Sequence, residues 1–172
     1  MKGFYKIFQL VALVCTMCLT ACTVSYKLNG ASIDYTTTKT ISFEQFPIKA
    51  PLVYTPLAVN FNDELQSKYA SQTRLSQVRT DGDLQISGAI TGYSLSPTAV
   101  KSDAYASQTR LTIKVKVKFV NKNNKAENFE QDFSAYRDFD ATRLLTDVQD
   151  DLCNEMIDEL VEAIFNATVA QW

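Results

Sequence analysis

The sequence predicts an α+β domain, a two-layer sandwich in which two helices pack on one face of a four-stranded mixed sheet. Apolar residues recur every three to four positions over residues 56–71 and again near the C-terminus, as in amphipathic helices. Residues 111–119 alternate between apolar and polar side chains, as in a half-buried strand. Three shorter stretches carry weaker strand patterns, so the predicted order is β-α-β-β-β-α.

The first two predicted elements are a strand over residues 40–46 and a helix over residues 56–71. In the strand, β-branched and aromatic residues nearly alternate with polar ones. Pro56 suits the first turn of the helix, and Thr55 is its expected N-cap. The apolar stripe of this helix consists of Leu57, Ala58, Phe61, Leu65 and Tyr69.

Three strands are expected next. An Asp-Gly-Asp turn at residues 81–83 leads into a strand over 84–92. A loop over residues 96–107 precedes the strand over 111–119, and an asparagine-rich turn at 121–125 joins it to a fourth strand over 129–136. If this hairpin is centred near Asn124, Phe119 faces Phe129 and Val115 faces Phe133 on the core side.

The last element is a helix for which Asp140 is the expected N-cap. Its apolar stripe extends from Leu144 to Phe165, and its opposite face is acidic. Carboxylate pairs such as Asp150/Asp151 lie on that polar face, where a solvated surface is far more common than an acid–base pair.

The N-terminus has the layout of a lipoprotein signal. Lys2 and Lys6 precede an apolar run of about 13 residues, too short to span a bilayer, which needs roughly 20. Leu-Thr-Ala-Cys then closes the run as a lipobox. The sequence therefore predicts a signal peptide over residues 1–21, a lipid anchor on Cys22, a polar tether over 22–38 and one domain over 39–172.

Composition excludes several function classes. Removing residues 1–21 leaves 151 residues with 15 basic and 19 acidic side chains, and this net charge of −4 argues against nucleic acid as a partner. The chain contains no histidine, which removes histidine-based triads and histidine-ligated zinc. No nucleophile motif or phosphate-binding glycine loop is present, so we expect neither an enzyme nor a cofactor.

Lys114, Lys116 and Lys118 project from one face of the strand over 111–119, about 7 Å apart. This spacing suits an array of anionic groups. The alternative is internal pairing, because the same hairpin register sets Lys118 against Glu130 and Lys116 against Asp132. Both interpretations stay open, since exposed ion pairs contribute only about 0–1 kcal/mol and exchange readily.

One heptapeptide, Tyr-Ala-Ser-Gln-Thr-Arg-Leu, occurs twice, at residues 69–75 and 105–111. The flanking sequences differ, so the pair does not indicate a repeat architecture. We expect the first copy to end a helix and the second to enter a strand.

The mature chain resembles the LPS-assembly lipoprotein family (LptE) in its Bacteroidetes form. The resemblance rests on the lipobox cysteine, Phe46-Pro47, Gly-Asp-Leu at 82–84, Gly-Ala-Ile-Thr-Gly-Tyr at 88–93, and the segments 110–119, 129–133 and 170–172. It implies two helices on a four-stranded sheet, and a lipoprotein that plugs the β-barrel translocon for lipopolysaccharide and helps to assemble it. Lipopolysaccharide carries phosphates, which makes the three lysines and Arg110 the candidate contacts.

The expected partners are thus the outer-membrane barrel, lipopolysaccharide and the membrane, through the lipid anchor. Thr23 replaces the aspartate that favours inner-membrane retention, so we expect an outer-membrane lipoprotein facing the periplasm. The alternative function is a scaffold or accessory subunit of another envelope complex, such as a transporter.

Overall fold

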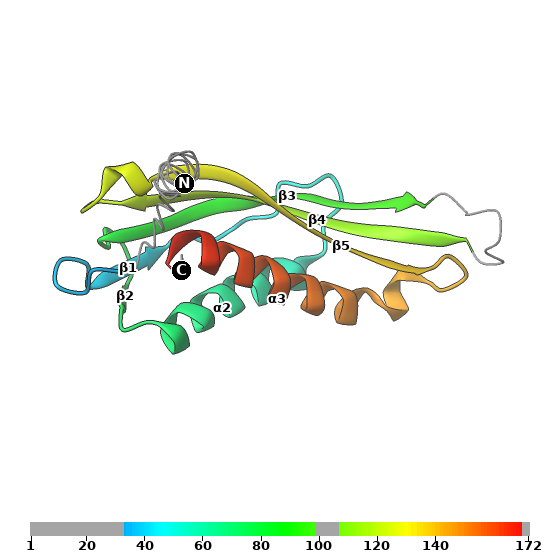
Figure 1. The fold of residues 1–172 in the computed structure, drawn as a ribbon. Coiled ribbons are helices and arrows are strands. Elements are labelled where there is room, and N and C mark those ends of the chain that lie inside the picture. Colours follow the sequence, from blue (N-terminus) through cyan, green and yellow to red (C-terminus); the bar gives the residue numbers. More distant parts are fainter. Residues whose placement is uncertain (1–32, 99–106, 170–172) are drawn as a thin grey trace, which may run out of the picture.

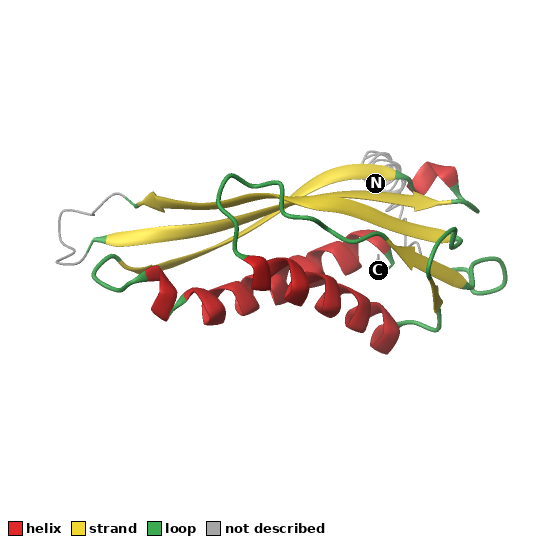
Figure 2. Cartoon of the chain, turned by 180° about the vertical axis from the view of Figure 1, so that it is seen from behind, coloured by secondary structure: helices red, strands yellow, loops and turns green. Residues whose placement is uncertain are grey.

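A computed structural model describes residues 33–98 and 107–169, which form two layers (Figure 1). One layer is a mixed sheet with the strand order β2-β1-β3-β4-β5. The other consists of two helices on the same face of that sheet, as the view from behind also shows (Figure 2). The predicted α+β sandwich is confirmed, but the sheet has five strands instead of four, and the order of helices and strands is therefore β-α-β-β-β-β-α instead of β-α-β-β-β-α.

The three long strands form an antiparallel meander. They are β3 (Leu84–Pro97), β4 (Gln108–Asn121) and β5 (Phe129–Asp140), and a short 3-10 helix, η2 (Lys125–Glu127), lies in the β4–β5 turn. Phe119 lies opposite Phe129 and Val115 opposite Phe133, so the predicted hairpin register is correct. Each strand is longer than predicted, and most of the expected loop over 96–107 falls outside the described residues.

The additional strand is β2 (Ser76–Val78), which pairs in parallel with β1 (Thr40–Phe43) at one edge of the sheet. β1 in turn pairs in parallel with β3. The predicted first strand was too long at its C-terminal end, because β1 ends at Phe43. The Glu44 N–H still bonds the Ile86 carbonyl, and Ile48 forms an isolated bridge to Ile90. β2 has no buried residue, so it carries no hydrophobic alternation from which it could be predicted.

The helices are α2 (Thr55–Gln72) and α3 (Gln149–Thr168), and they run in the same direction. The residue numbers of the contacting pairs increase together along both helices, from Asn60 with Asn154 to Lys68 with Glu162 and Tyr69 with Thr168. This parallel arrangement follows from the topology, since each helix follows a strand and packs back on the same sheet face.

Both predicted helix caps are wrong. Tyr54 is the N-cap of α2, which places Thr55 inside the helix with Pro56 in the first turn. Asp140 does not cap α3, because its carboxylate accepts bonds from the backbone and the hydroxyl of Thr142 and so closes a turn. A second 3-10 helix, η3 (Leu145–Asp147), separates this turn from α3.

Phe46 fills the space above Gly88 in the core between the layers. A Cβ atom on Gly88 would lie 2.0 Å from the Lys116 carbonyl oxygen and 2.5 Å from the Phe46 ring. Phe46 also packs edge-to-face on Phe61 of α2, with ring centroids 5.2 Å apart. Asn62 holds the same segment, because its side chain is buried and bonds the Phe46 N–H and C=O groups.

The two copies of the heptapeptide adopt different structures. The first ends α2 at Gln72, and Leu75 is buried beyond it. In the second copy, the described residues enter β4 at Gln108. The predicted helix end and strand entrance are both confirmed for these residues.

The predicted signal peptide, Cys22 and most of the predicted tether lie outside the described residues. Residues 33–38 belong to that tether and contact the domain. Thr38 is buried, and the Asn123 side chain donates to the Thr37 carbonyl and the Thr38 hydroxyl. None of the helices in residues 33–98 and 107–169 has the length and apolar character needed to cross a membrane.

Candidate functional site

The sheet face that carries no helices, here called the outer face, bears the predicted lysine row of Lys114, Lys116 and Lys118 on β4. All three side chains are exposed. Lys116 alone of the three forms an ion pair within the described chain, with its Nζ 3.5 Å from an oxygen of Glu130. The register is as predicted, but the ion pair differs from the Lys116–Asp132 pair of the internal-pairing alternative, because Lys116 reaches diagonally to Glu130, two residues from Asp132.

The lysine row is therefore largely available for contact. Lys114 lies opposite Ser134, and Lys118 is left without Glu130, which Lys116 takes. Both side chains of the Lys116–Glu130 pair are about half exposed, so the pair contributes at most about 1 kcal/mol. Internal pairing thus accounts for one lysine of the three.

Arg110, on the same face, is held differently. Its guanidinium binds both carboxylate oxygens of Asp138, at 2.7 and 2.8 Å, and lies 3.8 Å above the centre of the Tyr136 ring. The bond from Arg110 holds the pKa of Asp138 below its usual value. A ligand anion would have to compete with this bidentate pair, so Arg110 is a weaker candidate than the lysines.

The partners of Arg110 were missed at the sequence level, although a signal existed. The register that sets Lys118 opposite Glu130 also sets Arg110 opposite Asp138 when the hairpin is extended. The prediction stopped at residue 136 and therefore left Arg110 without a partner.

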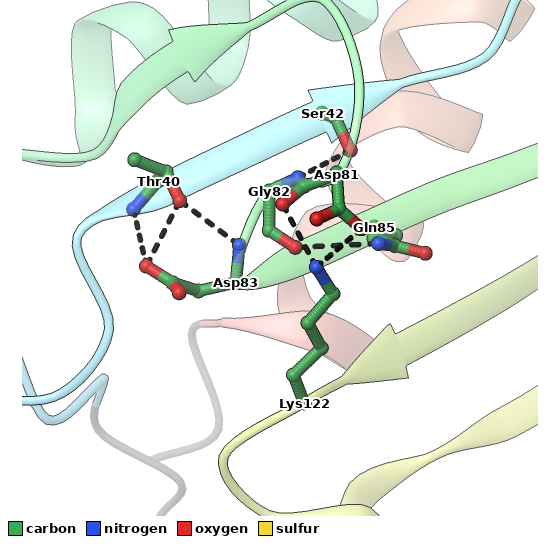
Figure 3. A network of polar contacts seen from close by, with 7 residues as sticks. All are labelled: Thr40, Ser42, Asp81, Gly82, Asp83, Gln85 and Lys122. Atoms are coloured by element: carbon green, nitrogen blue, oxygen red, sulfur yellow. Dashed lines mark hydrogen bonds and ion pairs between the residues drawn. The ribbon is translucent and has the colours of Figure 1, made fainter.

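A polar network fixes the end of the sheet where β1 joins β3 (Figure 3). Asp83 accepts bonds from the Lys39 and Thr40 N–H groups and from the Thr40 hydroxyl, at 2.9 to 3.0 Å. These bonds lower the pKa of Asp83, and the bond from the Lys39 N–H has the largest effect. Lys122, which follows β4, donates to the backbone and side chain of Asp81 and so ties the meander to this turn.

Gly82 is required in this network for space. A Cβ atom there would lie 2.6 Å from the Ser42 nitrogen and 2.8 Å from Ile41, both backbone atoms. Asp81 takes the left-handed conformation, with φ of 63°, as turn residues of its type tolerate. The Gly-Asp-Leu segment noted in the sequence thus has a structural role, in holding β1 against the start of β3.

Three of the hollows on the described surface bear on function. One, about 500 Å³, lies at the end of the sheet near Phe119. The Asn121 and Asn124 side chains bond Glu127 within the loop, and the Asn123 side chain bonds Thr37 and Thr38. The second, about 310 Å³, lies between the helices and is acidic. The third, about 170 Å³, lies on the outer face beside Lys118 and Arg79.

The described residues offer little for catalysis. No group of three or more His, Cys, Asp or Glu side chains among them could hold a metal ion. Cys153 is buried in the core, and burial raises the pKa of its thiol to about 11. The thiol is therefore protonated at neutral pH and behaves as a small apolar side chain.

Comparison with protein families gives a match to the model described as LptE, Lipopolysaccharide-assembly, over residues 38–168. The chain belongs to the LptE family. The match covers nearly all of the described fold, from the residue before Lys39 to the end of α3. LptE is a non-enzymatic lipoprotein family of lipopolysaccharide assembly. A search of curated proteins found no significant match.

Several solved structures are similar to this chain at low sequence identity. Protein XCC0632 from Xanthomonas campestris has a TM-score of 0.50 at 12% identity, over 74% of this chain and 81% of that one. A minor lipoprotein from Acinetobacter baumannii has a TM-score of 0.48 at 12% identity, over 74% and 89%. Lipoprotein B from Nitrosomonas europaea has a TM-score of 0.47 at 15% identity, over 74% and 79%.

Proposed function

We propose that this LptE-family lipoprotein is the plug and assembly partner of the outer-membrane β-barrel that translocates lipopolysaccharide, and that it assists transport to the outer leaflet. The family match over residues 38–168 carries the proposal. The mixed-charge outer face also supports it, because a domain inside a hydrated barrel needs a polar surface. The chain acts by binding and not by catalysis.

In this proposal, the anchor is an acylated Cys22 in the inner leaflet of the outer membrane. Stable anchoring requires more than one acyl chain, which lipidation of an N-terminal cysteine supplies. Residues 33–38 contact the domain, so the tether between Cys22 and Ile33 has 10 residues, which reach at most about 40 Å when extended. That length allows the domain to sit at the periplasmic mouth of a barrel or inside it.

The test is affinity purification of the tagged full-length lipoprotein from membranes. We expect a large outer-membrane barrel protein to co-purify, and depletion of the lipoprotein to reduce the amount of assembled barrel. Recovery of inner-membrane transporter components in place of a barrel would overturn the proposal and favour a scaffold of another envelope complex.

The lysine row is the proposed contact for lipopolysaccharide phosphates. Replacing Lys114, Lys116 and Lys118 together by glutamine should weaken binding of phosphorylated lipopolysaccharide about tenfold, if each exposed contact contributes about 0.5 kcal/mol. The matched control replaces three exposed lysines elsewhere, Lys39, Lys49 and Lys125, and removes the same net charge. Equal effects of the two triple variants would refute a specific role for the row.

A further inference from the structure

β5 ends the sheet, and one side of this strand has no neighbouring strand in the described chain. Residues of an antiparallel ladder alternate in the side to which their N–H and C=O groups point. The Thr98 N–H bonds the Gln108 carbonyl on the β3 side, and the Ala141 N–H bonds the Ser107 carbonyl on the β5 side. Odd-numbered residues of β5 therefore bond β4, and even-numbered residues point their backbone groups to the free edge.

The free edge of β5 is accessible. Its members are the even-numbered residues Glu130, Asp132, Ser134, Tyr136 and Asp138, and all of them are exposed. Of their backbone groups, the Tyr136 carbonyl accepts a bond of 2.9 Å from the guanidinium of Arg137, and the others have no hydrogen-bond partner within the described chain. The stretch from Glu130 to Ser134 thus presents an open row of donors and acceptors, which is the template for one more strand.

The flanks of this edge carry an excess of negative charge. On the outer face, Lys116 pairs with Glu130, whereas Asp132 has no ion pair among the described residues. On the helix face, Glu155 and Glu159 of α3 share the single guanidinium of Arg137, at 2.9 and 2.8 Å. Both faces therefore favour basic side chains on an incoming strand.

The same charges disfavour a second copy of this chain as the occupant. An antiparallel pair of β5 strands about a two-fold axis would bring Glu130 and Asp132 of both copies onto one short face. Like charges placed opposite each other destabilise a sheet. β2, at the other edge of the sheet, has three residues and offers too little length for stable pairing.

We infer that the free edge of β5, centred on residues 130–134, binds an extended segment of a partner protein that carries lysine or arginine side chains and adds to the sheet as a sixth strand. Backbone bonds supply the attraction in this mode of recognition, and alternate side chains supply the choice of partner. The Arg137 bond to Tyr136 limits the pairing to the part of the strand before it. The inference goes beyond the proposed function, because it assigns a protein partner to the backbone edge of β5, whereas the lysine row of β4 is the proposed contact for phosphates.

The test uses hydrogen exchange of the full-length lipoprotein in detergent, with a short peptide that alternates lysine and threonine as the probe. We expect the amides of Asp132 and Ser134 to gain at least about tenfold protection, while the odd-numbered amides, already bonded to β4, do not change. A matched peptide that alternates glutamate and threonine should give no protection. Equal protection by both peptides, or none by the basic one, would overturn the inference.

Two variants separate the backbone from the charge contribution. Ser134→Pro removes an N–H group from the free edge and leaves the hydrogen bonds to β4 in place, and edge strands tolerate proline at such positions. This variant should abolish binding of the basic peptide. Ser134→Thr keeps the N–H group and should bind as the native chain does. Asp132→Lys leaves the backbone intact and should weaken the basic peptide at least about tenfold.

Unchanged binding by Asp132→Lys would refute the inference even if the proline variant failed to fold. Failure of this inference can be told apart from failure of the proposed function. A chain that binds the basic peptide but captures no barrel would count against the translocon partner alone, and a chain that captures the barrel without edge protection would count against the edge alone.

Discussion

Replacing Asn62 by alanine should destabilise the domain by about 1–3 kcal/mol, because it leaves a buried backbone donor without a partner. The Asn62 oxygen accepts the Phe46 N–H at 2.8 Å, and its amide nitrogen donates to the Ala58 carbonyl at 2.7 Å. The bond to the Phe46 carbonyl is longer, at 3.3 Å. In Asn62→Ala the Ala58 carbonyl keeps its hydrogen bond within α2, so the loss of stability comes mainly from the Phe46 N–H group, which is left without an acceptor.

Urea denaturation followed by far-ultraviolet circular dichroism measures this loss directly. Asn60→Ala is the matched control, since Asn60 is exposed on the same helix and makes one long bond, of 3.2 Å, to Asn154. That variant should change the free energy of unfolding by less than about 0.5 kcal/mol. If Asn62→Ala lost no more than Asn60→Ala, the buried bond to Phe46 would not hold the 44–54 segment to the core.

Three further outcomes follow from the described geometry. Gly88→Ala should lower the free energy of unfolding by at least about 1–3 kcal/mol, measured in thermal melts, because the added Cβ would clash with the backbone oxygen of Lys116. Gly92→Ala is the control, since the nearest neighbour of its Cβ would be a side chain at 3.0 Å. A loss for Gly88→Ala no greater than that for Gly92→Ala would contradict this expectation. The pKa of Asp83 is lower in the folded chain than its ordinary value of 3.8, so stability should fall as the pH drops below 3.8 and on through that lowered pKa. Acid titrations should show a smaller fall for Asp83→Asn, and an identical pH profile would refute the role of the carboxylate. Cys153, with its pKa raised to about 11, should resist thiol reagents at pH 8 until urea unfolds the chain, and rapid labelling of the folded protein would show that the core opens.

The long elements could be predicted from sequence because burial imposes a period on them. In β4 the alternate apolar residues from Leu111 to Phe119 are buried and the lysines between them are exposed, which is the alternation read from residues 111–119. The hairpin register followed, since only one pairing of β4 with β5 matches both faces.

The missed features depend on contacts that leave no periodic signal. β2 consists of exposed residues and forms only because α2 returns the chain to the edge of β1. Asp140 has the composition of a helix cap, but it bonds Thr142 in a turn, and the helix begins at Gln149. The lysine row was placed correctly, whereas the partner of Lys116 depends on the reach of a flexible side chain, which register alone does not set.

The position of β1 has a mechanical consequence. β1 is the first strand of the domain, and yet it lies inside the sheet, in parallel pairing with β2 on one side and β3 on the other. A pull on the N-terminal end along the strand therefore loads its hydrogen bonds in shear, all together, instead of opening them one at a time. Resistance to such a force depends on the rate of unfolding and not on equilibrium stability. A domain tethered at this end should thus hold its fold under tension better than one tethered through an edge strand.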